Sequence, residues 1–188
     1  MTRPSTQLRG TLRRCVASSA LLLLLAACAA EPKRDLVAEA EALCFDEKWD
    51  KAKDLLRQHL LDNPNDTAAH FYLGRCYLMA SPERFRPATA EGEFQTALHI
   101  FRRNGRINPI EGFASADYFE YICQIESAKV YLNIVDLLLD SRVNIRQVQE
   151  FVRRGKSYVD LAAETLPGDP DLPEYQRAFE SLELRRWN

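Results

Sequence analysis

The stretch WDKAKDLLRQHLLDNPND, residues 49–66, determines how the rest of the chain is interpreted. Its apolar residues recur every three or four positions, which is the spacing of one face of an α-helix. Those residues are Trp49, Ala52, Leu55, Leu56 and Leu60. Pro64 interrupts this pattern, because proline cannot donate the hydrogen bond that a helix interior requires. The asparagines and aspartates around it are suitable caps for the next helix. The stretch therefore predicts one helix, a break, and the start of a second.

The same helical spacing recurs along most of the chain, and no useful length alternates with the period of a β-strand. We expect seven helices, with apolar stripes at Leu36, Ala40, Leu43; at 52–60; at Phe71, Leu73, Tyr77, Met79; at Phe94, Ala97, Leu98, Phe101; at 116–140; at 145–165; and at Tyr175, Ala178, Phe179, Leu182. Asn144 with Gln147 resembles a capping box, and Asp171 before Pro173 marks another helix start. A long loop is expected around residues 104–112. The chain is predicted to be all-α.

Small and large residues recur at fixed distances in three places. These are Ala52, Leu56 and Pro64; Ala90, Phe94 and Ala97; and Gly155, Val159, Ala162 and Pro167. A small residue lets two antiparallel helices approach, and a large apolar residue fills the seam between them. This spacing resembles the tetratricopeptide repeat. Residues 33–66 match closely, and residues 67–102 match with about four extra residues near 81–86. Residues 116–167 match only in the second helix.

The resemblance implies a superhelix of about three helical hairpins over residues 35–188, ended by a capping helix from Leu172. In that family the first helix of each hairpin lines a concave binding groove. The matching positions here are Val37, Glu41, Phe45, Phe71, Arg75, Met79, Lys129 and Asn133. Arg75 and Lys129 are suited to hold carboxylates of a partner, and Phe45 and Phe71 to take apolar anchors. The alternative is that several such positions, with Cys44, Leu78 and Leu132, are core residues.

The N-terminal residues 1–27 have the composition of a secretory signal. A head with four arginines precedes an apolar run over 16–25 and then small residues. The run is shorter than the ~20 apolar residues that span a bilayer. Leu25-Ala26-Ala27-Cys28 resembles the lipobox of bacterial lipoproteins, which implies acylation at Cys28 and a tether over 28–34. No aspartate follows Cys28, which by the same resemblance favours the outer membrane, facing the periplasm. An ordinary signal peptide with an incidental cysteine is the alternative.

Three cysteines then remain, Cys44, Cys76 and Cys123. An exported protein can be oxidised, so their pairing matters. One interpretation is that all three are small buried residues. The other is a bridge between Cys44 and Cys76, and the sequence leaves the two open.

The charge and the motifs favour binding over catalysis. Removing the four arginines of the leader changes the net charge from −2 to −6, which argues against nucleic acid as a partner. The chain has three histidines, without an HExxH motif, and contains no GxSxG, Walker or GxGxxG motif. We therefore expect no enzyme, no metal and no cofactor, but a scaffold for a protein or peptide partner in the envelope. The alternatives are a small cell-wall-modifying enzyme on a helical frame and a purely structural lipoprotein. The oligomeric state stays open.

Overall fold

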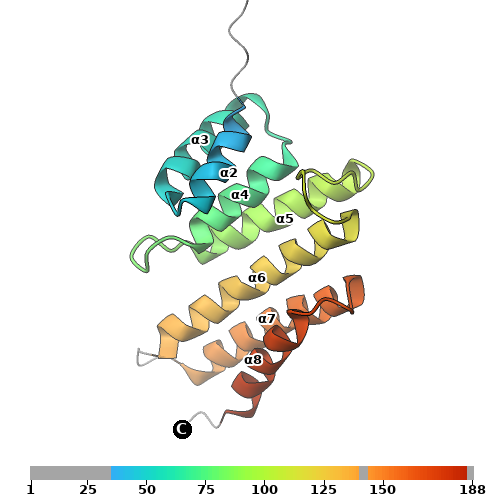
Figure 1. Ribbon diagram of the computed structural model, residues 1–188. Helices are drawn as coiled ribbons and strands as arrows, with labels where there is room; N and C mark the ends of the chain where they lie inside the picture. Colours follow the sequence, from blue (N-terminus) through green and yellow to red (C-terminus); the bar gives the residue numbers. More distant parts are fainter. Residues whose placement is uncertain (1–34, 140–143, 186–188) are drawn as a thin grey trace, which may run out of the picture. The chain divides into compact units, whose positions relative to one another are not determined.

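The computed structural model describes residues 35–139 and 144–185, and these form seven α-helices and no strand (Figure 1). The helices are α2 (Leu36–Phe45), α3 (Trp49–Asp62), α4 (Thr67–Leu78), α5 (Pro87–Arg103), α6 (Ala116–Leu139), α7 (Ile145–Thr165) and α8 (Leu172–Leu184). The predicted all-α class is confirmed. All seven helices belong to one compact unit that begins at Leu36. The predicted leader, the acylation site at Cys28 and the tether lie outside the described residues.

Each helix packs against the next one along the chain (Figure 1). The tightest pairs are α2 with α3, α4 with α5, and α6 with α7, so the chain folds as three hairpins followed by α8. The first helices of successive hairpins also touch, because α4 contacts both α2 and α6. The hairpins are therefore stacked in chain order, with α2, α4 and α6 as neighbours.

The seams between helices use the small and large residues that the spacing indicated. Ala52, Leu56, Ala90 and Phe94 are all fully buried. Gly74 on α4 faces the Phe94 ring so closely that a Cβ atom there would lie 2.7 Å from a ring carbon. The small residue at this position is therefore a requirement of close helix packing, because atoms cannot approach to that distance without a shift.

The helices begin and end near the predicted start and stop signals, with differences in detail. Asp66 caps α4, and its Oδ1 accepts from the Ala69 backbone N–H at 3.0 Å. Asn144 caps α7 through the Arg146 N–H, also at 3.0 Å. Asp171 precedes α8 without a side-chain cap bond. The expected long loop lies between α5 and α6, and Gly105 and Gly112 in it adopt φ values of +77° and +89°, which glycine tolerates best.

Two clusters of buried side chains form the core. The first joins α2–α5 to α6 and contains the aromatic residues Phe71, Phe94, Phe101 and Phe119. The second joins α6, α7 and α8 around Tyr121, Tyr131 and Phe179. Helix α6 belongs to both clusters, so it connects the two halves of the array. Among the described helices, none has both the length and the apolar character needed to cross a bilayer.

Candidate functional site

The residues predicted for the groove lie on the three neighbouring first helices. Val37, Glu41 and Phe45 are on α2, Phe71 and Arg75 are on α4 with Met79 at its C-terminal cap, and Lys129 and Asn133 are on α6. Phe45, Met79 and Asn133 are exposed, whereas Val37, Glu41, Arg75 and Lys129 are half-buried. Because α4 contacts both α2 and α6, the fold brings these positions onto adjacent helices.

Phe71 was predicted to line the groove, and this prediction is wrong because the residue lies in the core. Its side chain is 1% exposed. Its ring packs 5.4 Å from Tyr72 and 5.6 Å from Phe119, between ring centroids, and further contacts reach Phe94 and Phe113. This aromatic cluster removes Phe71 from any surface that a partner can reach. Cys44 and Leu78 are also buried, as the alternative interpretation held.

A polar cluster occupies the junction of α2 and α4. The Tyr72 hydroxyl donates a hydrogen bond to the Glu41 carboxylate. Burial, together with this bond, raises the pKa of Tyr72 far above its usual value, so the hydroxyl stays protonated. The Arg75 Nε is buried and has no hydrogen-bond partner in the described structure. Arg75 therefore belongs partly to the packed junction of α2 and α4 and not wholly to the surface.

Lys129, in contrast, already has partners within the chain. Its Nζ lies 3.0 Å from Glu126 Oε1 on the same helix and 5.6 Å from the centre of the Tyr175 ring on α8. Burial opposes its charge, but the Glu126 carboxylate outweighs that effect and raises the pKa of Lys129. The ammonium group therefore stays charged, and an internal carboxylate occupies the place that was expected for a partner's.

An apolar pocket lies where the C-terminal halves of α4 and α6 approach the α4–α5 loop. It has a volume of about 210 Å³ and is lined by Leu78, Ala80, Pro82, Phe85, Asn133, Asp136 and Leu137. Of these, the sequence predicted Asn133 as a groove residue and left Leu78 open between groove and core. The others were missed because the loop residues follow no helical repeat, and their proximity to α6 arises from hairpin stacking. The loop does coincide with the extra residues that interrupt the repeat spacing, which is the one signal that pointed to it.

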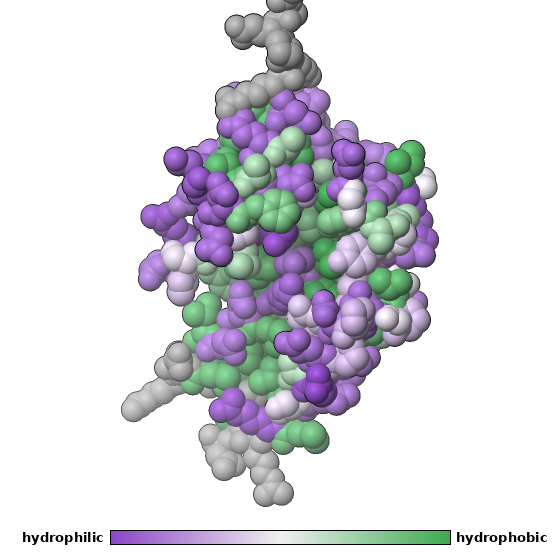
Figure 2. Space-filling model, in the orientation of Figure 1, coloured by the Kyte–Doolittle hydropathy of each residue, from purple (hydrophilic) through white to green (hydrophobic). Residues whose placement is uncertain are grey.

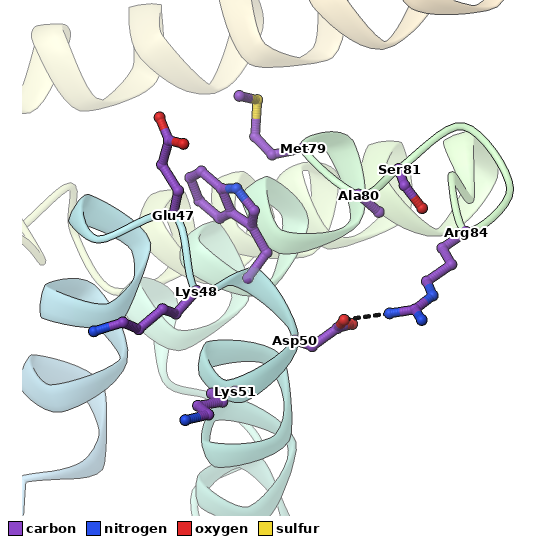
Figure 3. Close-up of a pocket in the computed structure, with 9 residues that line it drawn as sticks. Glu47, Lys48, Asp50, Lys51, Met79, Ala80, Ser81 and Arg84 are labelled. Atoms are coloured by element: carbon purple, nitrogen blue, oxygen red, sulfur yellow. Dashed lines mark hydrogen bonds and ion pairs between the residues drawn. The ribbon is translucent and has the colours of Figure 1, made fainter.

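A second pocket, of about 310 Å³, lies at the turn between α2 and α3 (Figure 3). Five of its nine lining residues are of charged types; the lining consists of Glu47, Lys48, Trp49, Asp50, Lys51, Met79, Ala80, Ser81 and Arg84. Figure 3 shows Arg84 extending from the α4–α5 loop to Asp50, with which it forms an ion pair. Ala80 lines both this pocket and the apolar one, so the two pockets are adjacent.

The surface between these features is mixed. On the face shown in Figure 2, apolar patches alternate with polar side chains, and a broad apolar area lies over the region of α6–α8.

Within the described residues, no group of three histidine, cysteine or acidic side chains is arranged to hold a metal ion. Comparisons with family models, curated proteins and solved structures found no match to this chain.

Proposed function

We propose that this chain is a lipid-anchored helical scaffold that binds a protein or peptide partner at the bacterial cell envelope. The observation that carries the proposal is the adjacency of α2, α4 and α6, together with the apolar pocket between α4, α6 and the α4–α5 loop. Stacked helical hairpins commonly use such a row as an extended binding surface. A row of three hairpins has room to bind one extended segment or one helix of a partner protein.

The size of the apolar pocket favours an anchor residue of a macromolecular partner over a small-molecule substrate at that place. Small-molecule sites usually occupy ~300–1,000 Å³ and enclose most of the ligand. The apolar pocket, at about 210 Å³, is below that range, whereas the second pocket, at about 310 Å³, lies at its lower end. A pocket of the smaller size takes a single apolar side chain, as an anchor residue of a peptide or helix does. Asn133 and Asp136 at its edge supply the polar rim.

The anchor rests on the sequence of the leader. Acylation at Cys28 with two or more chains gives stable membrane attachment, whereas one chain holds a protein only marginally. Seven residues, 29–35, then separate the anchor from the start of α2, a reach of at most ~25 Å. Mass spectrometry of the protein from its native membrane should find an acylated Cys28 at the N-terminus. A chain that still begins at Met1 would overturn the proposed location.

Binding is tested by affinity capture after crosslinking in detergent-solubilised membranes. Leu137→Asp places a charge in the apolar pocket, and Leu161→Asp places the same charge on α7. Leu161 is a matched control for Leu137, because the two side chains are 45% and 44% exposed. We expect the Leu137 variant to lose about ten-fold or more of the captured partner and the Leu161 variant to retain it. Equal capture by both variants, or no partner above an unrelated lipoprotein anchor, would contradict the proposal.

A further inference from the structure

Two thiols from different helices lie in contact in the first core cluster. Cys44 on α2 and Cys76 on α4 are 32 residues apart in sequence, and their Sγ atoms are 3.8 Å apart. Both side chains are buried, Cys44 at 5% exposure and Cys76 at 2%. The third described cysteine, Cys123, is fully buried on α6. The described thiols therefore include one pair in contact across a helix–helix interface.

The two helices that carry this pair pack directly on each other. A disulfide requires an S–S distance of ~2.0 Å and a Cα–Cα distance of about 4.4–6.8 Å. Two sulfur atoms already in contact can reach bonding distance by side-chain rotation and a small adjustment of α2. Helix α2 is suited to such an adjustment, because it has 10 residues and buries only Ala40 and Cys44.

The surroundings also differentiate the two thiols chemically. The hydrogen bond from Cys76 lowers the pKa of Cys44; burial opposes this change, and the positive charge of Arg75 adds to it. The same hydrogen bond, together with burial, raises the pKa of Cys76. Because the thiolate is the nucleophile in disulfide exchange, Cys44 is the residue that reacts first. It is also the more exposed of the two.

We propose that Cys44 and Cys76 form an intramolecular disulfide that ties α2 to α4. The oxidant is a disulfide-bearing molecule of the kind present outside the cytoplasm, so the biological setting, though not the geometry, rests on the proposed function. The Cys44 thiolate attacks one sulfur of the oxidant, forms a mixed disulfide and releases one thiolate. Cys76 then loses its proton and attacks the Cys44 Sγ, which releases the second thiolate. The two cysteines lose two electrons, and the oxidant is reduced to two thiols.

The bond would fix the shortest of the described helices. Isolated helices shorter than ~12 residues are marginal in water, so α2 depends on its contacts with α3 and α4. Closing a loop of 32 residues reduces the conformational freedom of the unfolded chain. The Glu41–Tyr72 hydrogen bond joins the same two helices, so the disulfide would also hold the α2 part of the groove in place.

The test is oxidation of the purified full chain with oxidised glutathione, followed by alkylation and non-reducing peptide mass spectrometry. We expect a Cys44–Cys76 peptide, with Cys123 still free, and a Tm higher than that of the reduced protein by roughly 5–15 °C. Cys123→Ser should keep both results, whereas Cys44→Ser and Cys76→Ser should lose both. Two alkylated thiols at Cys44 and Cys76, or glutathione held on Cys44 without closure, would overturn the proposal.

A parallel measurement separates this inference from the proposed function. The thiol state of the protein taken directly from the cell envelope reports whether the chain meets an oxidant in the cell. A pair that closes with glutathione but is reduced in the cell would contradict export to an oxidising compartment and leave the disulfide-forming pair established. The wild-type measurement alone decides the inference, so it does not depend on the folding of any variant.

Discussion

At the scale of single residues, glycines determine how closely the helices approach. Gly155 on α7 faces Phe179 of α8 and Tyr131 of α6. A Cβ at this position would lie 2.3 Å from the Phe179 ring and 2.8 Å from the Tyr131 Cβ. Gly92 on α5 is the opposite case, since a Cβ there would meet nothing within 4 Å. The same residue type is therefore a packing requirement at one position and a helix weakness at the other.

Alanine substitution at these two glycines should change stability in opposite directions. Gly155→Ala forces Phe179 or the helices apart, and we expect it to lower the free energy of unfolding by about 1–3 kcal/mol. Gly92→Ala adds helix propensity without a clash and should raise it by up to ~1 kcal/mol. Urea unfolding followed by circular dichroism measures both. A neutral or stabilising Gly155 variant would contradict the packing described for α6, α7 and α8.

His70 gives the fold a specific dependence on pH. Its Nδ1 lies 2.6 Å from Glu93 Oε2 and its Nε2 lies 3.1 Å from the Pro64 carbonyl oxygen. Both neighbours are acceptors, and only the protonated ring has a hydrogen on each nitrogen. Burial opposes the charged form, yet these two bonds and the Glu93 charge, with a contribution from Asp66, raise the pKa of His70 above its ordinary value of 6.5.

A raised pKa in the folded state means that protonation stabilises the fold. The contribution of His70 is fully present below pH 6.5, the unfolded value, and is lost as the pH rises through the higher folded value. His70→Gln should flatten this part of the stability profile, measured by thermal unfolding between pH 5 and 9. His99→Gln, on the exposed face of α5, is the control and should leave the slope unchanged. An equal slope in the His70 variant would show that folding does not change the pKa of the ring, and it would contradict this prediction.

At the scale of helices, the start of α4 shows how one side chain serves two elements. Asp66 Oδ1 caps the Ala69 N–H, and its Oδ2 lies 2.9 Å from His59 Nε2 near the end of α3. The residue therefore satisfies an otherwise unpaired backbone donor of α4 and joins the end of the preceding helix to it. The break around Pro64 brings these two helix ends close in sequence.

Removing this cap should cost a predictable amount of stability. We expect Asp66→Ala to lower the free energy of unfolding by about 1 kcal/mol, with a range of ~0.5–2. Asp66→Asn keeps an oxygen that can cap the helix, so it should lose clearly less. Chemical denaturation of the two variants separates the outcomes. Equal losses would assign the role of Asp66 to its charge rather than to its cap.

The helices and their seams could be predicted from sequence because they depend on local spacing. Ala52, Leu56, Ala90 and Phe94 follow the 3.6-residue period, and all are buried as expected. The groove was only partly predictable. Phe71 belongs to the helix that was expected to line it, but whether a side chain faces the groove or the core depends on aromatic contacts from α5, α6 and the intervening loop. The apolar pocket was not predictable, since Phe85 and Leu137 meet only through hairpin stacking.

At the scale of the whole described array, Glu91 links the second hairpin to the third. Its Oε1 on α5 accepts hydrogen bonds from the hydroxyls of Tyr131 on α6, at 2.8 Å, and Tyr158 on α7, at 2.6 Å. Arg154 lies 5.4 Å from the centre of the Tyr131 ring and adds a cation over the same cluster. Together with α6, which belongs to both core clusters, this junction joins the second hairpin to the third.

The central claim is that a partner binds along the row formed by α2, α4 and α6. The most direct measurement is photo-crosslinking of the membrane-bound protein. The photo-reactive amino acid replaces Met79 or Asn133 on that row. In the controls it replaces Leu61 or Leu161, on the second helices α3 and α7. All four side chains are exposed, so none of the substitutions should disturb the core. We expect the variants at Met79 and Asn133 to crosslink to the same protein, and the variants at Leu61 and Leu161 not to crosslink to it. Crosslinking from the second helices instead, or with no preference among the four positions, would contradict the central claim.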